Sequence, residues 1–385
     1  MKTFFFGEPN IGKDEIDEIS KVIKSNWIGY GKKSIEFENK LLRYIGAKAG
    51  VALSSCTAAL HLSLILNGVK EGDEIITTSF TFAATSNVIV QMRAKPVFVD
   101  INKKTLNIDE DLVEEKINKK TKGIIVVHFG GLPCNMNKIN KIAKKYKLFV
   151  IEDAAHAFGA EINAKMIGNS NNLTCFSFYA NKNLTTIEGG FLCCNDIKKI
   201  ERAKILRLHG LDNNAWKRYK EKSNLSFEVI ELGYKYNITD IQSAFGLSQL
   251  KKFKTSLKLR QKRATLYDNI LSDIREIELQ PKFDLNIKHA FHLYAIVIKP
   301  NKFRVKRDEI VYELRRNGVF AVVHYKPLHL HKFYKEKFGY KKGDFKNTEI
   351  VGDNIFTLPL LPQVSLQNSK KIALVAKKIL QKYQK

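Results

Sequence analysis

Cysteine is scarce in this sequence, and its spacing suits neither a disulfide framework nor a zinc site. Five occur in 385 residues, an odd number with no C-x-x-C pair and no histidine at zinc spacing: Cys56, Cys134, Cys175, Cys193 and Cys194. This pattern argues against small disulfide-stapled proteins and zinc ribbons. We expect reduced thiols in the core or beside a pocket, and no metal site.

Long apolar runs are also lacking, although hydrophobic residues make up 44% of the chain. Residues 123–127 and 148–151 are typical of its short, charge-bounded runs, whereas a membrane-spanning helix needs about 20 apolar residues. The first nine residues contain three phenylalanines followed at once by Gly7 and Glu8, too short a stretch for a signal peptide. The sequence therefore predicts a soluble, cytoplasmic protein without membrane insertion.

Acidic residues are few relative to basic ones, and the formal net charge is +26. Such an excess is found in proteins that bind nucleic acid or anionic membranes. Here the basic residues are scattered, as in 118–122 and 251–263, with little aromatic interleaving and no helix-turn-helix or RNP-like signature. We interpret the charge as a solvated, lysine-rich surface and expect no nucleic acid partner.

Short apolar segments alternate with helical periodicity over residues 48–153. Strands are predicted at 51–53, 74–76, 96–99, 123–127 and 148–151, and helices at 57–66, 83–92, 110–117 and 137–145. This alternation predicts an α/β fold with a mostly parallel central sheet covered by helices on both faces.

The remaining chain predicts the end of this large domain and a smaller α+β domain. Strands at 176–179 and 190–194 flank a polar loop, and Thr239 or Asp240 is a candidate N-cap for a helix at 241–250. Further elements are predicted at 256–273 (helix), 293–298 (strand), 308–316 (helix, stopped by Asn317 and Gly318), 319–324 (strand) and 367–382 (helix). We expect a large domain over 1–250 and a small domain over 251–385.

Three positions carry candidate chemistry. Asp153 ends a predicted buried strand, where open α/β sheets place their ligands. Lys182 lies in a loop between two apolar strands, where a partly desolvated amine can attack a carbonyl. Thr57 opens a helix, where free N–H groups favour an anion. Taken singly, these residues are also compatible with a strand-end cap, a surface lysine and an ordinary helix start.

In combination, these segments resemble the DegT/DnrJ/EryC1/StrS sugar aminotransferases, which are fold-type I pyridoxal-phosphate enzymes. The resemblance covers almost the whole chain. It rests on residues 27–31 (WIGYG), 57–59 (TAA), 79–82 (SFTF), 128–133 (HFGGLP), 152–156 (EDAAH), Lys182 with 188–190 (EGG), 233–240 (GYKYNITD) and 324–327 (HYKP).

The resemblance implies that Lys182 holds pyridoxal 5'-phosphate as a Schiff base and shuttles protons in both half-reactions. Asp153 would keep the pyridine nitrogen protonated, because a nearby carboxylate favours the charged form. Phe82 would stack on the ring, although a core phenylalanine is the alternative. His156 would bind near the phenolic oxygen.

The implied phosphate site brings in a second subunit. Cys56, Thr57 and Ala58 with Ser177 would bind the phosphate, and Lys235 stands where many relatives have an asparagine that reaches the phosphate of the neighbouring subunit. That arrangement implies a homodimer with shared active sites; a solvent-facing Lys235 is the alternative.

Further residues resemble the nucleotide-sugar contacts of the family. They are Trp27, Tyr30, His324, Tyr325 and Lys326; for Trp27 and Tyr325, interface packing is the alternative. Four positions depart from common family patterns: Cys56, Asn135, Ala180 and Ile187. We expect them to lie close to the cofactor, and they put acceptor specificity in doubt.

The implied reaction is transfer of an amino group, with glutamate as the expected donor, to the C4 keto group of a nucleotide-linked keto sugar. The resemblance is to enzymes that make UDP-4-amino-4-deoxy-L-arabinose or 4-amino-4,6-dideoxy sugars, in surface polysaccharide or glycan biosynthesis. Alternatives are amination at C3, a small keto phosphate as acceptor, or dehydration, which Lys182 disfavours because the dehydrating branch has histidine there. A regulatory or nucleic-acid-binding protein of this fold is the non-enzymatic alternative.

Overall fold

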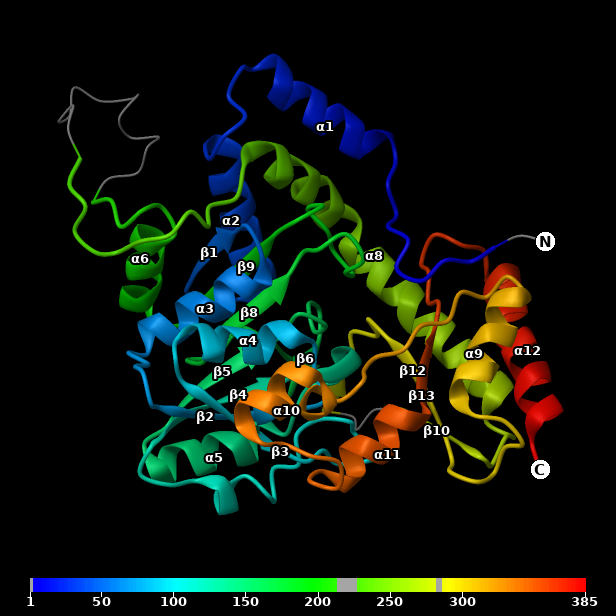
Figure 1. Cartoon of the computed structure of the whole chain (residues 1–385). Helices are drawn as coiled ribbons and strands as arrows, with labels where there is room; N and C mark the ends of the chain where they lie inside the picture. Colours follow the sequence, from blue (N-terminus) through cyan, green and yellow to red (C-terminus); the bar gives the residue numbers. More distant parts are fainter. Residues whose placement is uncertain (1–2, 213–226, 282–285) are drawn as a thin grey trace.

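The computed structural model describes residues 3–212, 227–281 and 286–385, which form a large lobe around a central sheet and a smaller lobe near the C-terminus (Figure 1). The seven strands of the central sheet lie in the order β1-β9-β8-β5-β4-β2-β3. They are β1 (Ala49–Leu53), β2 (Glu74–Thr78), β3 (Lys95–Val99), β4 (Thr121–Val127), β5 (Phe149–Asp153), β8 (Leu173–Ser177) and β9 (Gly190–Cys194). Only β9 runs antiparallel to its neighbours, so the mostly parallel sheet is confirmed.

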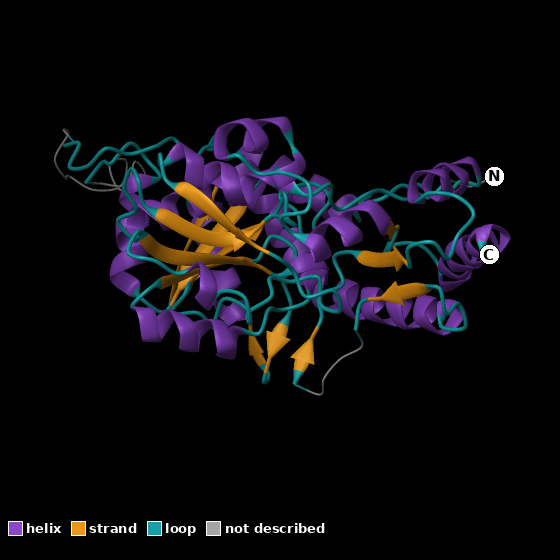
Figure 2. Cartoon of the chain, turned by 60° about the horizontal axis from the view of Figure 1, so that its bottom comes forward, coloured by secondary structure: helices purple, strands orange, loops and turns teal. Residues whose placement is uncertain are grey.

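Helices cover both faces of this sheet (Figure 2). Alternate residues of each strand point to opposite sides: Ile125 packs in one buried cluster, while Ile124 and Val126 pack in another. On the first side lie α3 (Cys56–Leu66), α4 (Ala83–Gln91) and α6 (Ile197–Leu206). The other side is covered by α2 (Lys32–Ile45), α5 (Met136–Tyr146) and the start of α8 (Asp240–Leu271).

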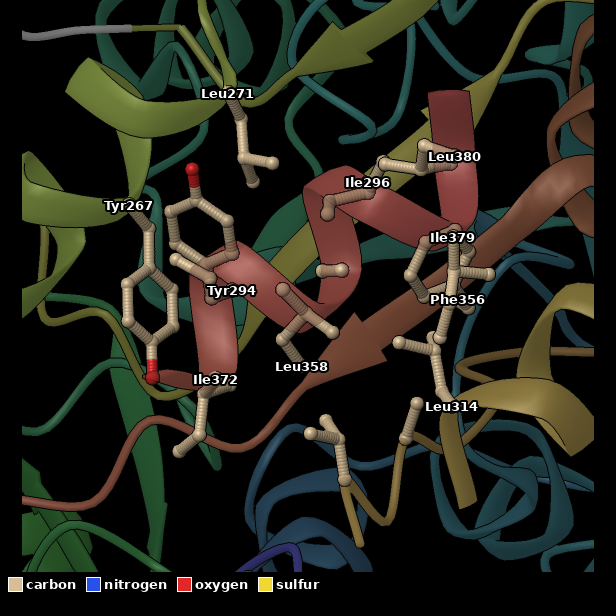
Figure 3. Packing of buried hydrophobic residues seen from close by; sticks show 14 of the residues in the cluster. Tyr267, Leu271, Tyr294, Ile296, Leu314, Phe356, Leu358, Ile372, Ile379 and Leu380 are labelled. Atoms are coloured by element: carbon tan, nitrogen blue, oxygen red, sulfur yellow. The ribbon is translucent and has the colours of Figure 1, made fainter. Parts of the chain in front are cut away.

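The smaller lobe is a three-stranded antiparallel sheet packed against helices. Its strands are β10 (Ile277–Leu279), β12 (Tyr294–Ile298) and β13 (Ile355–Leu358), and its helices include α9 (Arg307–Arg316), α12 (Leu366–Tyr383) and the end of α8. Tyr267 and Leu271 of α8 meet Ile372 of α12 and Tyr294 of β12 in its core (Figure 3).

The remaining elements lie at the periphery. Helix α1 (Lys13–Lys24) packs on α8, and a small third sheet is formed by β6 (Glu161–Ile162), β7 (Lys165–Met166) and β11 (Ile287–Lys288). Short turns of 3-10 helix are η1 (Glu114–Lys116), η2 (Phe129–Gly131) and η3 (Leu328–Leu330); α10 (Lys332–Phe338) and α11 (Lys346–Asn354) follow. In the described ranges, no helix combines the length and the apolar character needed to cross a bilayer.

Helix α8 differs from the prediction of two helices separated near residue 250. It runs without a break for 32 residues: it packs in the cores of both lobes, and no glycine or proline interrupts it between residues 250 and 256. Thr239 is its N-cap, in a capping box with Gln242. The predicted division between residues 250 and 251 falls inside this helix, and the domain bounds stay a prediction.

Two other predicted elements are wrong. Residues 110–117 contain only η1, because the Asp109 side chain accepts the N–H of Asp111 and stabilises a turn instead of a helix. Residues 319–324 make only isolated bridges at Val319 and Val322, because the N–H of Ala321 bonds back to the carbonyl of Val319.

Candidate active site

A cavity of about 390 Å³ opens beside the carboxyl ends of β5 and β8. This is the edge where parallel α/β sheets bind ligands. Nine of the residues predicted from the sequence line it: Cys56, Thr57, Phe82, Asp153, His156, Ser177, Lys182, His324 and Tyr325. The structure therefore brings together side chains that lie up to 269 positions apart in the chain.

Asp153, the last residue of β5, presents a buried carboxyl group to this cavity. Thr85 Oγ1 donates to its Oδ2 at 2.7 Å, and the N–H of Ala155 donates to its Oδ1 at 3.2 Å. Burial raises the pKa of Asp153, while these two hydrogen bonds lower it. A cation placed against this carboxyl would relieve the cost of burying its charge.

Lys182 is partly buried in the loop between β8 and β9, with its Nζ 3.5 Å from Nε2 of His292. Burial lowers the pKa of Lys182 to about 8, against the opposing effect of Cys56 and Asp153. At pH 7, about a tenth of the Lys182 side chains are therefore neutral amines, far more than at the usual pKa of 10.5. That is the form that attacks a carbonyl group.

The N-terminus of α3 faces the cavity as an anion site. Ser55 caps the helix by accepting the N–H of Ala58 at 3.1 Å, and Cys56 and Thr57 line the cavity. The first N–H groups of a helix lack partners within it. A Cβ at Gly190 would lie 2.3 Å from the backbone of Ser55, so only glycine lets β9 approach this helix end. Ala58 itself is buried and lies one position beyond the lining.

Aromatic and imidazole rings form another part of the cavity wall. Phe82 is 63% exposed although it lines the cavity, which leaves its ring face open for stacking. The N–H of Gly130 donates to Nδ1 of His156 at 3.3 Å, so Nε2 carries the ring hydrogen and donates to the Tyr325 hydroxyl at 3.2 Å. Both ring nitrogens of His156 thus have partners, and its contact with a phenolic oxygen stays a prediction.

His324 completes this wall from the segment before η3. Its Nδ1 lies 3.1 Å from Thr357 Oγ1. Burial, with Lys182 nearby, lowers the pKa of His324 to about 3. A neutral imidazole at this position offers hydrogen bonding without adding positive charge to the cavity.

Besides Ala58, four predicted residues lie outside the cavity. The Tyr30 hydroxyl donates to Glu38 at 3.1 Å, its ring lies under Arg207, and Trp27 Nε1 donates to the carbonyl oxygen of Tyr30. Lys235 and Lys326 are exposed. The roles predicted for these four residues, in binding the substrate or the phosphate, stay predictions. They would involve parts of the surface outside this cavity.

The positions that depart from the family patterns are not all close to the cavity. Cys56 lines it, and burial raises the pKa of its thiol, which keeps it neutral. Ile187 is exposed with a φ of +74°. Asn135 instead caps α5 through the N–H of Lys138 and does not line the cavity, so the expectation that it lies near the cofactor is wrong. All five cysteines are buried and free of disulfides.

Several residues in or beside the cavity were not predicted from the sequence. Thr85 donates to Asp153 but does not line the cavity. It lies on α4, three residues after Phe82, and this spacing is the only feature of the sequence that could have indicated it. His292 directly precedes an apolar strand, a position from which a side chain is more often part of the core. Asn181 also lines the cavity, and its buried Oδ1 has no hydrogen-bond partner in the described parts of the chain.

These residues fit pyridoxal 5'-phosphate by the chemistry of their side chains. A lysine of lowered pKa suits its aldehyde, a buried carboxyl group suits its ring nitrogen, and a helix N-terminus suits its phosphate. The orphaned oxygen of Asn181 is a further polar group that a ligand in the cavity would satisfy.

Comparisons with known proteins point the same way. The DegT/DnrJ/EryC1/StrS aminotransferase family matches residues 9–377. The spore coat polysaccharide biosynthesis protein SpsC of Bacillus subtilis is 40% identical over 358 residues, covering 93% of this chain and 92% of the relative. The UDP-4-amino-4-deoxy-L-arabinose--oxoglutarate aminotransferase of Shewanella sediminis is 36% identical over 369 residues, which cover 94% of this chain and 95% of the relative.

Solved structures extend the similarity to the whole fold. The putative sugar aminotransferase Spr1654 from Streptococcus pneumoniae, in its PMP form, has a TM-score of 0.92 to this chain at 30% sequence identity. The similarity covers 98% of this chain and 99% of that one.

Proposed function

We propose a donor and an acceptor for this protein from the premise that the chain belongs to the DegT/DnrJ/EryC1/StrS aminotransferase family. It is a pyridoxal-phosphate-dependent sugar aminotransferase. Its proposed reaction moves the amino group of L-glutamate to the C4 keto group of a nucleotide-linked keto sugar, a 6-deoxyhexose or a related pentose. The proposed role is in surface polysaccharide or glycan biosynthesis.

The observation that carries the reaction type is the amine of Lys182 in the same cavity as the Asp153 carboxyl. The substrate is supported by similarity: the Shewanella sediminis relative is named for a 4-amino sugar and for oxoglutarate, the keto acid that glutamate becomes. The Bacillus subtilis relative is named for polysaccharide biosynthesis. Because fold does not fix substrate, position C4 and glutamate are the parts to be tested.

The proposed roles of the cavity residues follow from their chemistry. Asp153 binds the ring nitrogen and keeps it protonated, and Phe82 orients the ring face. Thr57 and Ser177, with the backbone at Cys56 and Ala58, bind the phosphate. When bound, pyridoxal phosphate supplies an electron-withdrawing ring that stabilises negative charge at the carbon from which a proton leaves.

Lys182 has two tasks in this proposal. Its Nζ binds the cofactor covalently, and as a free amine it takes the proton from the α-carbon of the donor. The lowered pKa of Lys182, about 8, favours both, because an ammonium group can neither attack nor accept a proton. The buried, neutral histidines around it add no competing charge.

The proposed assembly is a homodimer in which Lys235 reaches the phosphate of the neighbouring subunit. An exposed apolar segment supports this: Phe227, Val229 and Ile230 are 51%, 65% and 55% exposed, and Leu232 is 80% exposed. Such residues usually mark an interaction surface, and this segment leads directly to Lys235. Trp27, Tyr30, His324, Tyr325 and Lys326 are the proposed nucleotide-sugar contacts.

Incubation with glutamate and a panel of UDP-, GDP- and dTDP-linked keto sugars tests the proposal. Release of 2-oxoglutarate in amounts above one per active site, only with a 4-keto sugar, is the expected result. Product analysis by NMR separates amination at C4 from amination at C3, and small keto phosphates form a parallel arm. If no nucleotide sugar supports release, the proposed acceptor is wrong.

A further inference from the structure

We propose that His292 is a further residue of the active site, which accepts a hydrogen bond from Nζ of Lys182 and orients that amine for reaction. Its imidazole is held in the tautomer required for this by Asn183. The inference rests on the proposed role of Lys182, and it deepens that role.

His292 lies where a partner of Lys182 must lie. Its Nε2 is 3.5 Å from Nζ, and its buried ring lines the same cavity. Hydrogen bonds at catalytic groups are often long in the absence of ligand. The ring packs against that of His156 at a tilt of 38°, with the centroids 4.5 Å apart, which restricts its rotation.

The tautomer of His292 follows from a chain of contacts that ends at a backbone carbonyl. Asn183 Nδ2 donates to the carbonyl oxygen of Ala290 at 2.8 Å. A carbonyl oxygen only accepts, so the amide of Asn183 must present its Oδ1 on the other side, 3.4 Å from Nδ1 of His292. Nδ1 therefore carries the hydrogen, and Nε2 has a free lone pair toward Lys182.

The surroundings keep this imidazole neutral, as the role requires. Burial lowers the pKa of His292 well below its usual value, and Lys182, His156, Arg260 and His324 act in the same direction. An imidazolium would have no lone pair to offer. His292 orients the amine and takes no proton from it when Nζ attacks; the two hydrogens of the amine leave afterwards with the aldehyde oxygen as water.

Orientation has a direct consequence for reactivity. A neutral amine has two hydrogens and one lone pair, which rotate freely about the Cε–Nζ bond. When one hydrogen is held by His292, the lone pair samples fewer directions, and a larger share of encounters with an aldehyde has the reactive geometry.

The test uses the rate at which cofactor-free, full-length protein combines with pyridoxal 5'-phosphate, followed by the visible absorbance that appears when Lys182 and the aldehyde join. Replacement His292→Leu removes the acceptor and is expected to slow this step by about tenfold, the loss of one hydrogen bond to a reacting group. His292→Gln keeps an acceptor oxygen and is expected to recover most of the rate.

A matched control stands three residues away. His289 is also buried and neutral, but its Nε2 faces Gln280 instead of Lys182. His289→Leu should therefore leave the rate within about twofold of the unmodified protein, because it removes a buried imidazole without touching Nζ. If His292→Leu and His289→Leu slow the reaction with pyridoxal 5'-phosphate equally, His292 has only a packing role and the proposal is overturned.

A second variant leaves the imidazole in place. Asn183→Ala frees the tautomer of His292 and is expected to slow the step by about threefold, since both tautomers then compete. If His292→Leu does not fold, the Asn183→Ala variant tests the proposal in its place. An unchanged rate in Asn183→Ala would then contradict the proposal. The step needs no sugar, so its outcome is independent of the acceptor panel: failure of either experiment leaves the other standing.

Discussion

Thr85 Oγ1 lies 2.7 Å from Oδ2 of Asp153, on the side of the carboxyl group that α4 covers. The hydroxyl of Thr85 is also within 2.8 Å of that of Thr81. Asp153 is thereby held by Thr85 of α4, the helix whose N-cap residue is Phe82. The carboxyl that would bind the ring nitrogen and the aromatic ring that would stack on the ring face are thus positioned by the same element.

Replacing Thr85 with valine tests this arrangement. Loss of one hydrogen bond to a carboxylate is expected to raise the pKa of Asp153 further and to weaken cofactor binding by about tenfold. The dissociation constant of pyridoxal 5'-phosphate, measured by fluorescence, checks this. Serine at position 85 keeps the hydroxyl and serves as the control, and equal affinity of the valine and serine variants would contradict the assignment.

Lys182→Ala is expected to abolish borohydride-dependent attachment of the cofactor at position 182 and to lower turnover by about a thousandfold or more, because one amine serves as nucleophile and base. Peptide mapping after reduction provides the measurement. Lys120→Ala, a change of an exposed lysine, is the control. Substantial turnover without Lys182 would remove the basis of the proposed function.

The pKa of Lys182 also predicts how stability changes with pH. Its pKa falls from 10.5 to about 8 on folding, so between these values the unfolded chain binds more protons and stability rises with pH. Below about pH 8 the folded state carries the cost of a buried ammonium. Lys182→Met should therefore stabilise the cofactor-free protein by about 3 kcal/mol at pH 7.

That gain should shrink as the pH rises from 8 toward 10.5, where the lysine is neutral in the folded state. Urea unfolding of both proteins at several pH values measures the difference. A gain that does not change with pH would show that packing, not charge, sets the effect.

Tyr30→Phe separates two roles of one residue. Tyr30 donates to Glu38, which also accepts from the buried Arg207. If this network is all that Tyr30 does, loss of the hydroxyl should cost about 1 kcal/mol of stability and leave the KM for the nucleotide sugar unchanged. A raised KM at unchanged kcat would instead support the proposed substrate contact.

Leu232→Glu tests the proposed dimer. A charge placed on an apolar contact surface is expected to dissociate the assembly, since burial of an unpaired carboxylate is costly. Sedimentation velocity should show a smaller species than the unmodified protein. Glu228→Gln, in the same segment, is the control, and an unchanged assembly in the Leu232 variant would place the contact elsewhere.

The sequence predicted most of the large lobe, because its signals are local. Strands β1 to β5 follow short apolar runs, and the cap at Thr239 follows from its own hydroxyl and from Gln242. Where a signal was non-local, prediction failed. The continuity of α8 depends on packing against both lobes, and residues 319–324 depend on contacts with Phe4 and Thr357.

The residues of the site also divide into those with a local sequence signal and those without one. Lys182, Asp153 and Thr57 could be recognised from motifs, since each has a characteristic local setting. Thr85 and His292 could not, because what marks them is a distance of 2.7 Å or 3.5 Å to a residue far along the chain. Asn183, next to Lys182 in sequence, acquires its role only through Ala290.

Helix α8 belongs to both lobes, with Phe253 in the core of one and Tyr267 in the core of the other. A hinge motion that closes the small lobe on the large one would have to bend helix α8 and stretch its backbone hydrogen bonds. Accommodation of sugars of different size therefore falls to individual side chains and to the loop around Lys182. Changes of acceptor in laboratory evolution should accumulate there, and seldom along the helix.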